Sequence, residues 1–200
     1  MKLDKRKAYD IYDRILSVLE ELVKIGCDLD RVDAIRIADD AADYRGPLYQ
    51  GSSSKKNIIR PREQLRIAKN RGKYTILHCD GNLMKAYMAL KLTKIYDGLR
   101  PLDLMPKPAV KAAIRWIMEV IRLREIVGWN TVFFTGIPID LVFNNYVEAQ
   151  EFVKILLSLL EEHGLKRLVL STTHSEYPGR SYNEPRVRIK IDILKRGFPL

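Results

Sequence analysis

A histidine and an aspartate two residues apart end one apolar segment of the chain, residues 74–82 (YTILHCDGN). An imidazole beside a carboxylate can act as an acid, a base or a metal ligand, and Asp80 could fix the tautomer of His78 or share its ligand. The alternative is a structural histidine that bonds to the backbone, with Gly81 making the turn. We favour the functional interpretation because the segment reads as a buried parallel strand, whose carboxyl end is where such sheets bind ligands.

Polar side chains also follow the other predicted strands. They are Asp39 and Asp40 after 33–38, Arg100 after 96–99, Asp140 after 131–136, and His174 after 167–171. Adjacent residues at a strand end point in different directions, so one functional carboxylate of the Asp39–Asp40 pair is expected rather than two on one atom. Arg100 is either a clamp for a substrate carboxylate or a surface arginine. His174 is either functional or solvated in its loop.

The predicted site divides into two groups. The predicted catalytic residues are His78, Asp80, Asp40 and His174, and the predicted substrate-binding residues are Asp39, Asn82, Arg100, Asp140 and Tyr177. A zinc site made of His78, Asp80 and His174 is chemically reasonable, because imidazoles and carboxylates are ordinary zinc ligands. Their spacing does not require a metal, so our prediction assigns none.

The elements that would position these residues alternate between helix and strand. Apolar periodicity and Gly or Pro boundaries predict helices at 7–25, 61–72, 83–92, 108–127 and 147–163, between the strands named above. A loop is expected over 41–60. Residues 187–194 fit both the strand and the helix period. This alternation, with nearly continuous apolar strands, predicts an α/β fold whose parallel sheet is covered on both faces.

Composition places the chain among ordinary globular proteins, with 46% hydrophobic and 30% charged residues in 200 positions. No stretch approaches the roughly 20 apolar residues that span a bilayer, and the first residues lack the apolar core of a signal peptide. We therefore expect a cytoplasmic protein. The two cysteines, Cys27 and Cys79, are not expected to form a disulfide there. The abundance of Lys, Arg and Glu is typical of thermophiles.

The formal net charge of +10 is concentrated between Lys55 and Lys73, where eight basic residues accompany one acidic residue. Such a cluster attracts nucleic acid or small anions, although a solvated helix face explains it equally well. Almost no aromatic residue is interleaved, which counts against a single-strand binding platform. A nucleic-acid partner is therefore the least favoured alternative.

Five short motifs in order resemble the uroporphyrinogen decarboxylase superfamily, which includes methyltransferases serving corrinoid proteins and coenzyme M. The motifs are IRIADDAADYRG, GKYTILHCDGNL, IYDGLRPLD, FFTGIPIDLVF and LVLSTTHSEYPGRSYNEPRV. The resemblance implies a TIM-type (β/α)8 barrel with its site at the carboxyl ends of the strands. It implies that His174 is similar to the family's last-loop histidine and that Asp40 lies where decarboxylases place a pocket serine. It also favours a helix for the terminal segment.

This sequence departs from the family in three respects. The coenzyme M methyltransferases have His-x-Cys where His78, Cys79 and Asp80 stand, so their zinc–thiolate chemistry is disfavoured here. The decarboxylases' arginine-rich opening and catalytic aspartate belong to a first barrel half with no counterpart in this sequence. Only about the last five βα units are recognised, over 27–200, behind a leading helix at 1–26.

A five-stranded part of a barrel would expose two strand edges and the barrel interior. We therefore expect a single partial-barrel domain that forms a homo-oligomer or binds a second chain supplying the missing half. The favoured function is an enzyme or enzyme subunit of corrinoid-linked methyl transfer, or of tetrapyrrole-type decarboxylation, on a small anionic substrate. The cofactors in question are zinc and a corrinoid on a partner protein. The alternative is a non-catalytic half-barrel that serves association.

Overall fold

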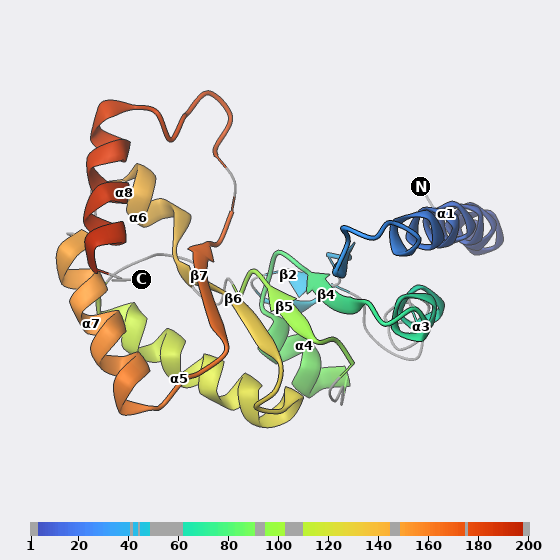
Figure 1. The fold of residues 1–200 in the computed structure, drawn as a ribbon, viewed down its shortest axis with the longest axis horizontal. Coiled ribbons are helices and arrows are strands. Elements are labelled where there is room, and N and C mark those ends of the chain that lie inside the picture. The colour runs from blue at the N-terminus through green and yellow to red at the C-terminus, as the bar shows by residue number, and fades with distance from the viewer. Residues whose placement is uncertain are drawn as a thin grey trace.

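A five-stranded parallel sheet organises the chain (Figure 1). The computed structural model describes residues 4–40, 42–43, 45–48, 62–90, 95–102, 110–144, 149–174 and 176–197. The strands are β1 (Ala34–Ala38), β4 (Tyr74–His78), β5 (Gly98–Arg100), β6 (Val132–Ile137) and β7 (Leu168–Thr172). They pair in chain order, β1-β4-β5-β6-β7, and every pair is parallel. The predicted α/β class and its five parallel strands are therefore confirmed.

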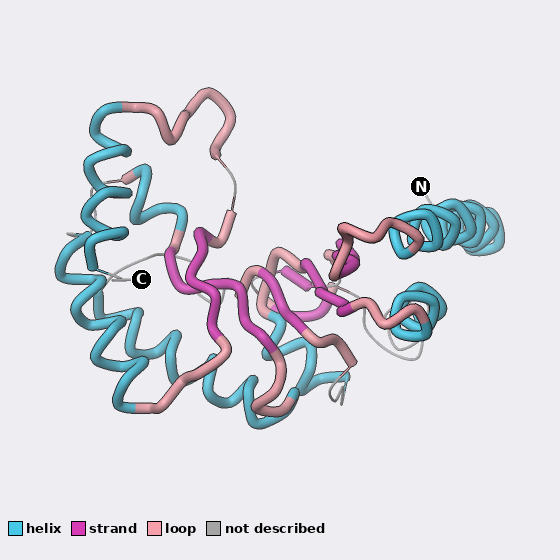
Figure 2. The backbone as a smooth tube through the Cα atoms, in the orientation of Figure 1, coloured by secondary structure: helices cyan, strands magenta, loops and turns pink. Residues whose placement is uncertain are grey.

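Helices connect the strands, as predicted. They are α1 (Lys5–Cys27), α3 (Arg62–Asn70), α4 (Leu83–Leu90), α5 (Val110–Val127), α6 (Ile139–Phe143), α7 (Ala149–Glu162) and α8 (Pro185–Gly197). The strand–helix alternation is visible along the tube in Figure 2. The predicted starts of helices at 61, 108 and 147 and the end of another at 92 lie outside the described residues, as do 41, 44 and 49–60 of the predicted loop.

The core lies between the sheet and the helices on one of its faces. Alternate strand side chains point to this face, so Leu77, Leu99 and Phe133 are buried, and the helices contribute Ile117 of α5 and Leu156 of α7. α4 packs against α5, α5 against α7, and α7 against α8 (Figure 1). One helix layer along a parallel sheet is the arrangement that a βα repeat produces when each crossover has the same hand.

The described residues cover the opposite face of the sheet only partly, which differs from the predicted sheet covered on both faces. Tyr74 and Val169 point to this face and are 64% and 46% exposed. A hollow of about 560 Å³ lies on it, lined by Tyr74, Ile76, Val132 and Phe134 among others. β4 is therefore half-buried rather than buried, since only alternate residues reach the core. An open inner face agrees with what we expect of an incomplete barrel.

Three short features refine the predicted order of elements. β2 (Ala42–Asp43) and β3 (Gly46–Pro47) pair antiparallel within the expected loop, and α6 follows β6 directly. The ambiguous terminal segment is the helix α8, which buries Val187 and Leu194 at helical spacing.

Two further expectations from the sequence concern the cysteines and a membrane-spanning helix. Cys27 and Cys79 are both free and buried. Among the described residues, no helix combines the length and the apolar character needed to cross a membrane.

Candidate functional site

Backbone hydrogen bonds join the carboxyl ends of β1, β4 and β5. The Asp39 N–H donates to the His78 carbonyl oxygen at 2.9 Å, and the Cys79 N–H donates to the Arg100 carbonyl oxygen at 2.9 Å. These bonds extend the sheet pairing by one residue beyond the strands. The first residue of each loop is therefore held in line with the strand before it. Predicted site residues on β1, β4 and β5 are therefore held at one edge.

The turn after β4, His78-Cys79-Asp80-Gly81, is fixed by its neighbours. Asp40 Oδ1 accepts a hydrogen bond from the Asp80 N–H at 2.9 Å. Gly81 has φ +154°, and a Cβ built there would lie 2.3 Å from the Ala42 carbonyl oxygen. Only glycine permits this close approach. Asp40 thus has a structural contact with the turn, whatever its chemical role.

Asp80 lies between two imidazoles. Its Oδ1 is 3.6 Å from Nε2 of His78 and 3.5 Å from Nδ1 of His174. Both distances exceed an ordinary hydrogen bond but allow a favourable interaction when either imidazole is protonated. The carboxylate is 42% exposed, and the imidazoles of His78 and His174 are 22% and 31% exposed. The three groups form an accessible acid–base cluster.

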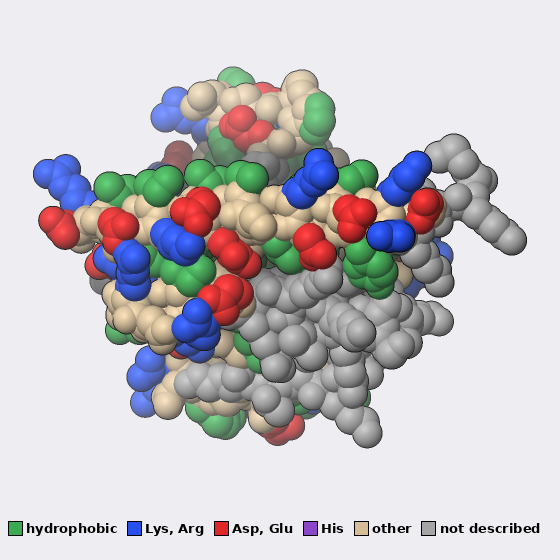
Figure 3. Space-filling view, turned by 90° about the vertical axis from the view of Figure 1, so that its right-hand side faces the viewer, with side chains coloured by type: hydrophobic (Ala, Val, Ile, Leu, Met, Phe, Trp, Pro, Cys, Tyr) green, Lys and Arg blue, Asp and Glu red, His purple; other side chains and the backbone are tan. Residues whose placement is uncertain are grey.

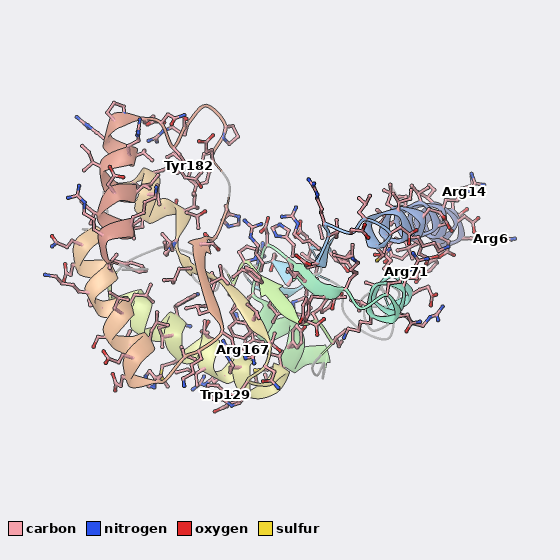
Figure 4. All side chains as sticks on the ribbon, in the orientation of Figure 1. Arg6, Arg14, Arg71, Trp129, Arg167 and Tyr182 are labelled. Atoms are coloured by element: carbon pink, nitrogen blue, oxygen red, sulfur yellow. The ribbon has the colours of Figure 1, made fainter. Side chains whose placement is uncertain are left out.

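The curvature of the sheet and the path of the β7 loop bring His174 to Asp80. β5 and β6 lie between β4 and β7, so in a flat sheet their ends would be roughly 14 Å apart, three spacings of about 4.8 Å. The Tyr182 hydroxyl helps to hold this loop, since it donates to the His174 carbonyl oxygen at 3.1 Å. Figure 4 shows Tyr182 between the start of α8 and the loop that follows β7.

Burial lowers the pKa of His78 below its ordinary value of 6.5. The Asp80 carboxylate acts in the opposite direction, while the guanidinium groups of Arg36 and Arg100 lower the pKa further. His78 Nδ1 is buried and has no hydrogen-bond partner among the described residues. At neutral pH His78 is therefore a neutral imidazole that could accept a proton.

Burial raises the pKa of the Asp39 carboxyl above its ordinary value of 3.8, and the neighbouring Asp40 carboxylate raises it further. The two adjacent aspartates thus lie in different surroundings. Asp39 is the partly desolvated one, and Asp40 bonds to the turn at Asp80.

Arg36 belongs to the site but was not predicted. In a strand alternate side chains share a face, and the register pairs Arg36 with Ile76 and Arg100 with His78, so all four residues share the inner face. The signal was present in the sequence, because a lone arginine between Ile35 and Ile37 must point away from the core. Arg36 and Arg100 give this end of the inner face two positive charges.

Asp140 and Tyr177 form a second polar group. Asp140 Oδ1 accepts hydrogen bonds from the Tyr177 hydroxyl at 2.5 Å and from Asn144 Nδ2 at 3.0 Å. These two predicted substrate-binding residues are therefore in direct contact, between α6 and the loop before α8. Their role in binding a substrate stays a prediction.

Asn82 has a structural task. It is 4% exposed, and its Oδ1 accepts a hydrogen bond from the Lys85 N–H at 3.0 Å, which satisfies a free donor at the start of α4. An amide at a helix start gives the same sequence pattern as an amide in a binding site, so the sequence did not separate the two.

The described part of the basic cluster is engaged within the chain. Arg66 pairs with Glu63, Arg71 with Asp28, and Lys69 and Lys73 donate to the carbonyl oxygens of Ile95 and Leu29. Lys55, Lys56 and Arg60 lie outside the described residues. These contacts favour the helix-face interpretation of the cluster over a nucleic-acid surface.

The residues do not fit the family's zinc–thiolate centre. The side chain of Cys79 is fully buried, on the helix side of the strand end. In the described part of the chain, no group of three or more His, Cys, Asp or Glu side chains has the geometry to hold a metal ion.

No known protein family, curated protein or solved structure matches this chain.

Proposed function

We propose that this chain is an enzyme or enzyme subunit that performs acid–base chemistry on a small anionic substrate, within a partial TIM-type barrel similar to the uroporphyrinogen decarboxylase superfamily. The observation that supports it best is the Asp80 carboxylate between His78 and His174. The two imidazoles come from strands that are not neighbours, which is common in catalytic sites at the carboxyl ends of barrel strands.

Each group has a role in this proposal. Neutral His78 accepts or relays a proton, and Asp80 stabilises the imidazolium of whichever histidine is protonated. Arg36 and Arg100 bind a carboxylate of the substrate on the inner face. The partly desolvated Asp39 is the residue best suited to remain protonated and donate a hydrogen bond.

Two reactions use such groups. In methyl transfer, the site would protonate the leaving group of a methyl donor, and a corrinoid on a partner protein would accept the methyl group. In decarboxylation, an acidic side chain would stabilise a protonated pyrrole. We favour methyl transfer, because its substrates vary widely and do not require an arginine-rich segment.

The three histidines provide the test. His78→Gln and His174→Gln remove the two site imidazoles, and His163→Gln, just after the end of α7, is a matched control. Methyl transfer from a methoxybenzoate, an anionic methyl donor, to added cob(I)alamin, followed by corrinoid absorbance, should fall by about 10²-fold or more in the site variants. Full activity in both site variants, or an equal loss in the control, would reject the assignment.

Binding supplies a test that needs no reaction. The imidazole C2 protons give one NMR resonance per histidine, and succinate or acetate should shift those of His78 and His174 but not that of His163. Arg100→Gln should weaken this response. If the carboxylates shift all three resonances equally, no carboxylate site exists at this edge.

A non-catalytic half-barrel is the second candidate, and the exposed inner face with Tyr74 and Val169 supports it. A protein of this kind would bind its partner equally well with or without His78 and His174. Activity in the wild type that disappears in the two variants would decide against it.

A further inference from the structure

Helix α1 carries an apolar face that the described part of the chain leaves uncovered. Its five side chains are Ile11, Ile15, Val18, Leu22 and Ile25, which are between 51% and 61% exposed. Leu29, just after the helix, continues the row and is 54% exposed. In Figure 3, which looks onto α1, hydrophobic side chains follow the length of the helix beside charged ones.

This face is distinct from the one that holds α1 to the rest of the chain. Val23 and Cys27 are buried and pack against Ala68 of α3, with Ile35 and Ile67 at the edge of the contact. The exposed row is centred on a different side of the helix from Val23 and Cys27. Its residues Ile15 and Leu22 also line a hollow between α1 and β1, but both side chains stay more than half exposed.

The spacing of the exposed row indicates what covers it. The residues recur at alternating intervals of four and three, from Ile11 through Leu29, which is a strict seven-residue repeat. Leu19, which is 40% exposed, lies beside this row. A sustained seven-residue repeat of apolar side chains is typical of a helix that packs along a second helix in a coiled coil. α1 has 23 residues, about 34 Å, which is enough for three repeats.

Charges beside the row indicate the direction of the partner helix. Lys7, Arg14, Glu21 and Asp28 occupy equivalent positions in successive repeats, with the positive pair before the negative pair. When two copies of α1 lie antiparallel, Arg14 faces Glu21 of the partner subunit and Lys7 faces Asp28 of the partner subunit. In a parallel pair the same positions would face Tyr12 and Leu19, and no charges would be matched.

We propose that a second copy of this chain docks on this face, so that the two α1 helices form an antiparallel coiled coil. Burial of the apolar row would provide the attraction, and the charge order would set the direction. Glu21 also contacts Lys24, and Asp28 also contacts Arg71, within the same chain. Arg14 projects from the side of α1 turned away from the sheet in Figure 4. The proposal is independent of the catalytic function.

The first experiment measures the mass of the full chain by sedimentation equilibrium over a range of micromolar concentrations. The wild type should be a dimer, and Val18→Asp should weaken dimerisation at least about tenfold, because each copy would bury an unpaired charge. Ser17→Asp places the same residue one position away on the polar side and should leave the dimer intact. Circular dichroism of each variant shows whether the fold is kept.

The second experiment tests the direction. Arg14→Glu and Glu21→Arg should each weaken the dimer, because like charges then face each other, and the double variant should restore it. A monomeric wild type, or a dimer that folded Val18→Asp leaves unchanged, would overturn the proposal. A dimer that is sensitive to Val18→Asp but indifferent to both charge changes would overturn the antiparallel arrangement.

Discussion

Substitution of Gly81 by alanine tests whether the turn after β4 is as tightly built as the structure shows. A Cβ at position 81 would lie 2.3 Å from the carbonyl oxygen of Ala42 and 2.7 Å from its carbonyl carbon. A comfortable carbon–oxygen contact is about 3.3 Å or more, so the backbone must move by roughly 1 Å. The backbone at φ +154° is also a conformation that side chains other than glycine avoid.

The two effects can be added as free energies of unfolding. A non-glycine residue in this region costs about 1–3 kcal/mol, and forcing an extra carbon against the backbone costs about 1–3 kcal/mol more. Gly81→Ala should therefore destabilise the protein by about 2–6 kcal/mol. This is a large share of the 5–15 kcal/mol that holds a typical domain folded.

Urea denaturation at neutral pH measures this loss, and Gly72→Ala is the matched control. Gly72 has φ +71° with nothing within 4 Å of its Cβ position, so its substitution adds only the left-handed strain of about 1–2 kcal/mol. If Gly81→Ala costs no more than Gly72→Ala, the contact between the turn and Ala42 is wrong, and the position of Asp80 loses its support.

Four further predictions concern individual side chains. Because the pKa of His78 is lowered, the unfolded chain takes up this proton first as the pH falls below about 6.5, so His78→Gln should reduce the loss of stability between pH 7.5 and 5.5 in urea titrations. The raised pKa of Asp39 means that its ionised form opposes folding, so Asp39→Asn should raise the melting temperature at pH 7, and the gain should disappear below about pH 3.8. Arg124 is fully buried and donates to the carbonyl oxygen of Thr131 at 2.8 Å; Arg124→Ala should cost about 2–5 kcal/mol by denaturation, and Arg124→Met, which keeps most of the volume, clearly less. Tyr177→Phe removes the hydrogen bond to Asp140 while keeping the ring, so it should cost about 1–3 kcal/mol, and an unchanged stability would mean that this contact contributes nothing.

Much of the fold could be predicted because its signals are local. The apolar run that became β4 ends in a glycine turn, and α1 shows its helical period over 23 residues. β2 and α6 were missed because elements of two and five residues are too short to show a period. The terminal segment fits both the strand period and the helix period in sequence. It is a helix in the structure, where packing buries Val187 and leaves Ile189 60% exposed.

The site could be predicted in position but not in its contacts. The rule that ligands lie off the carboxyl ends of parallel strands placed His78, Asp80 and Asp40 in one predicted site. The approach of His174 to Asp80 depends on how the sheet curves and how a loop folds, which no local pattern encodes. Whether one or both faces of the sheet are covered likewise depends on what surrounds the sheet. The apolar composition of the strands had predicted cover on both faces.

The order in which the strands pair allows the sheet to form while the chain is still being synthesised. Within the five-stranded sheet, each described strand is hydrogen-bonded to the strands of that sheet that precede and follow it in the sequence. At a synthesis rate of roughly 5–20 residues per second, each βα unit can join the growing sheet as it leaves the ribosome. The carboxyl edge would thus be assembled progressively, with His174 reaching Asp80 only when the last strand has been added.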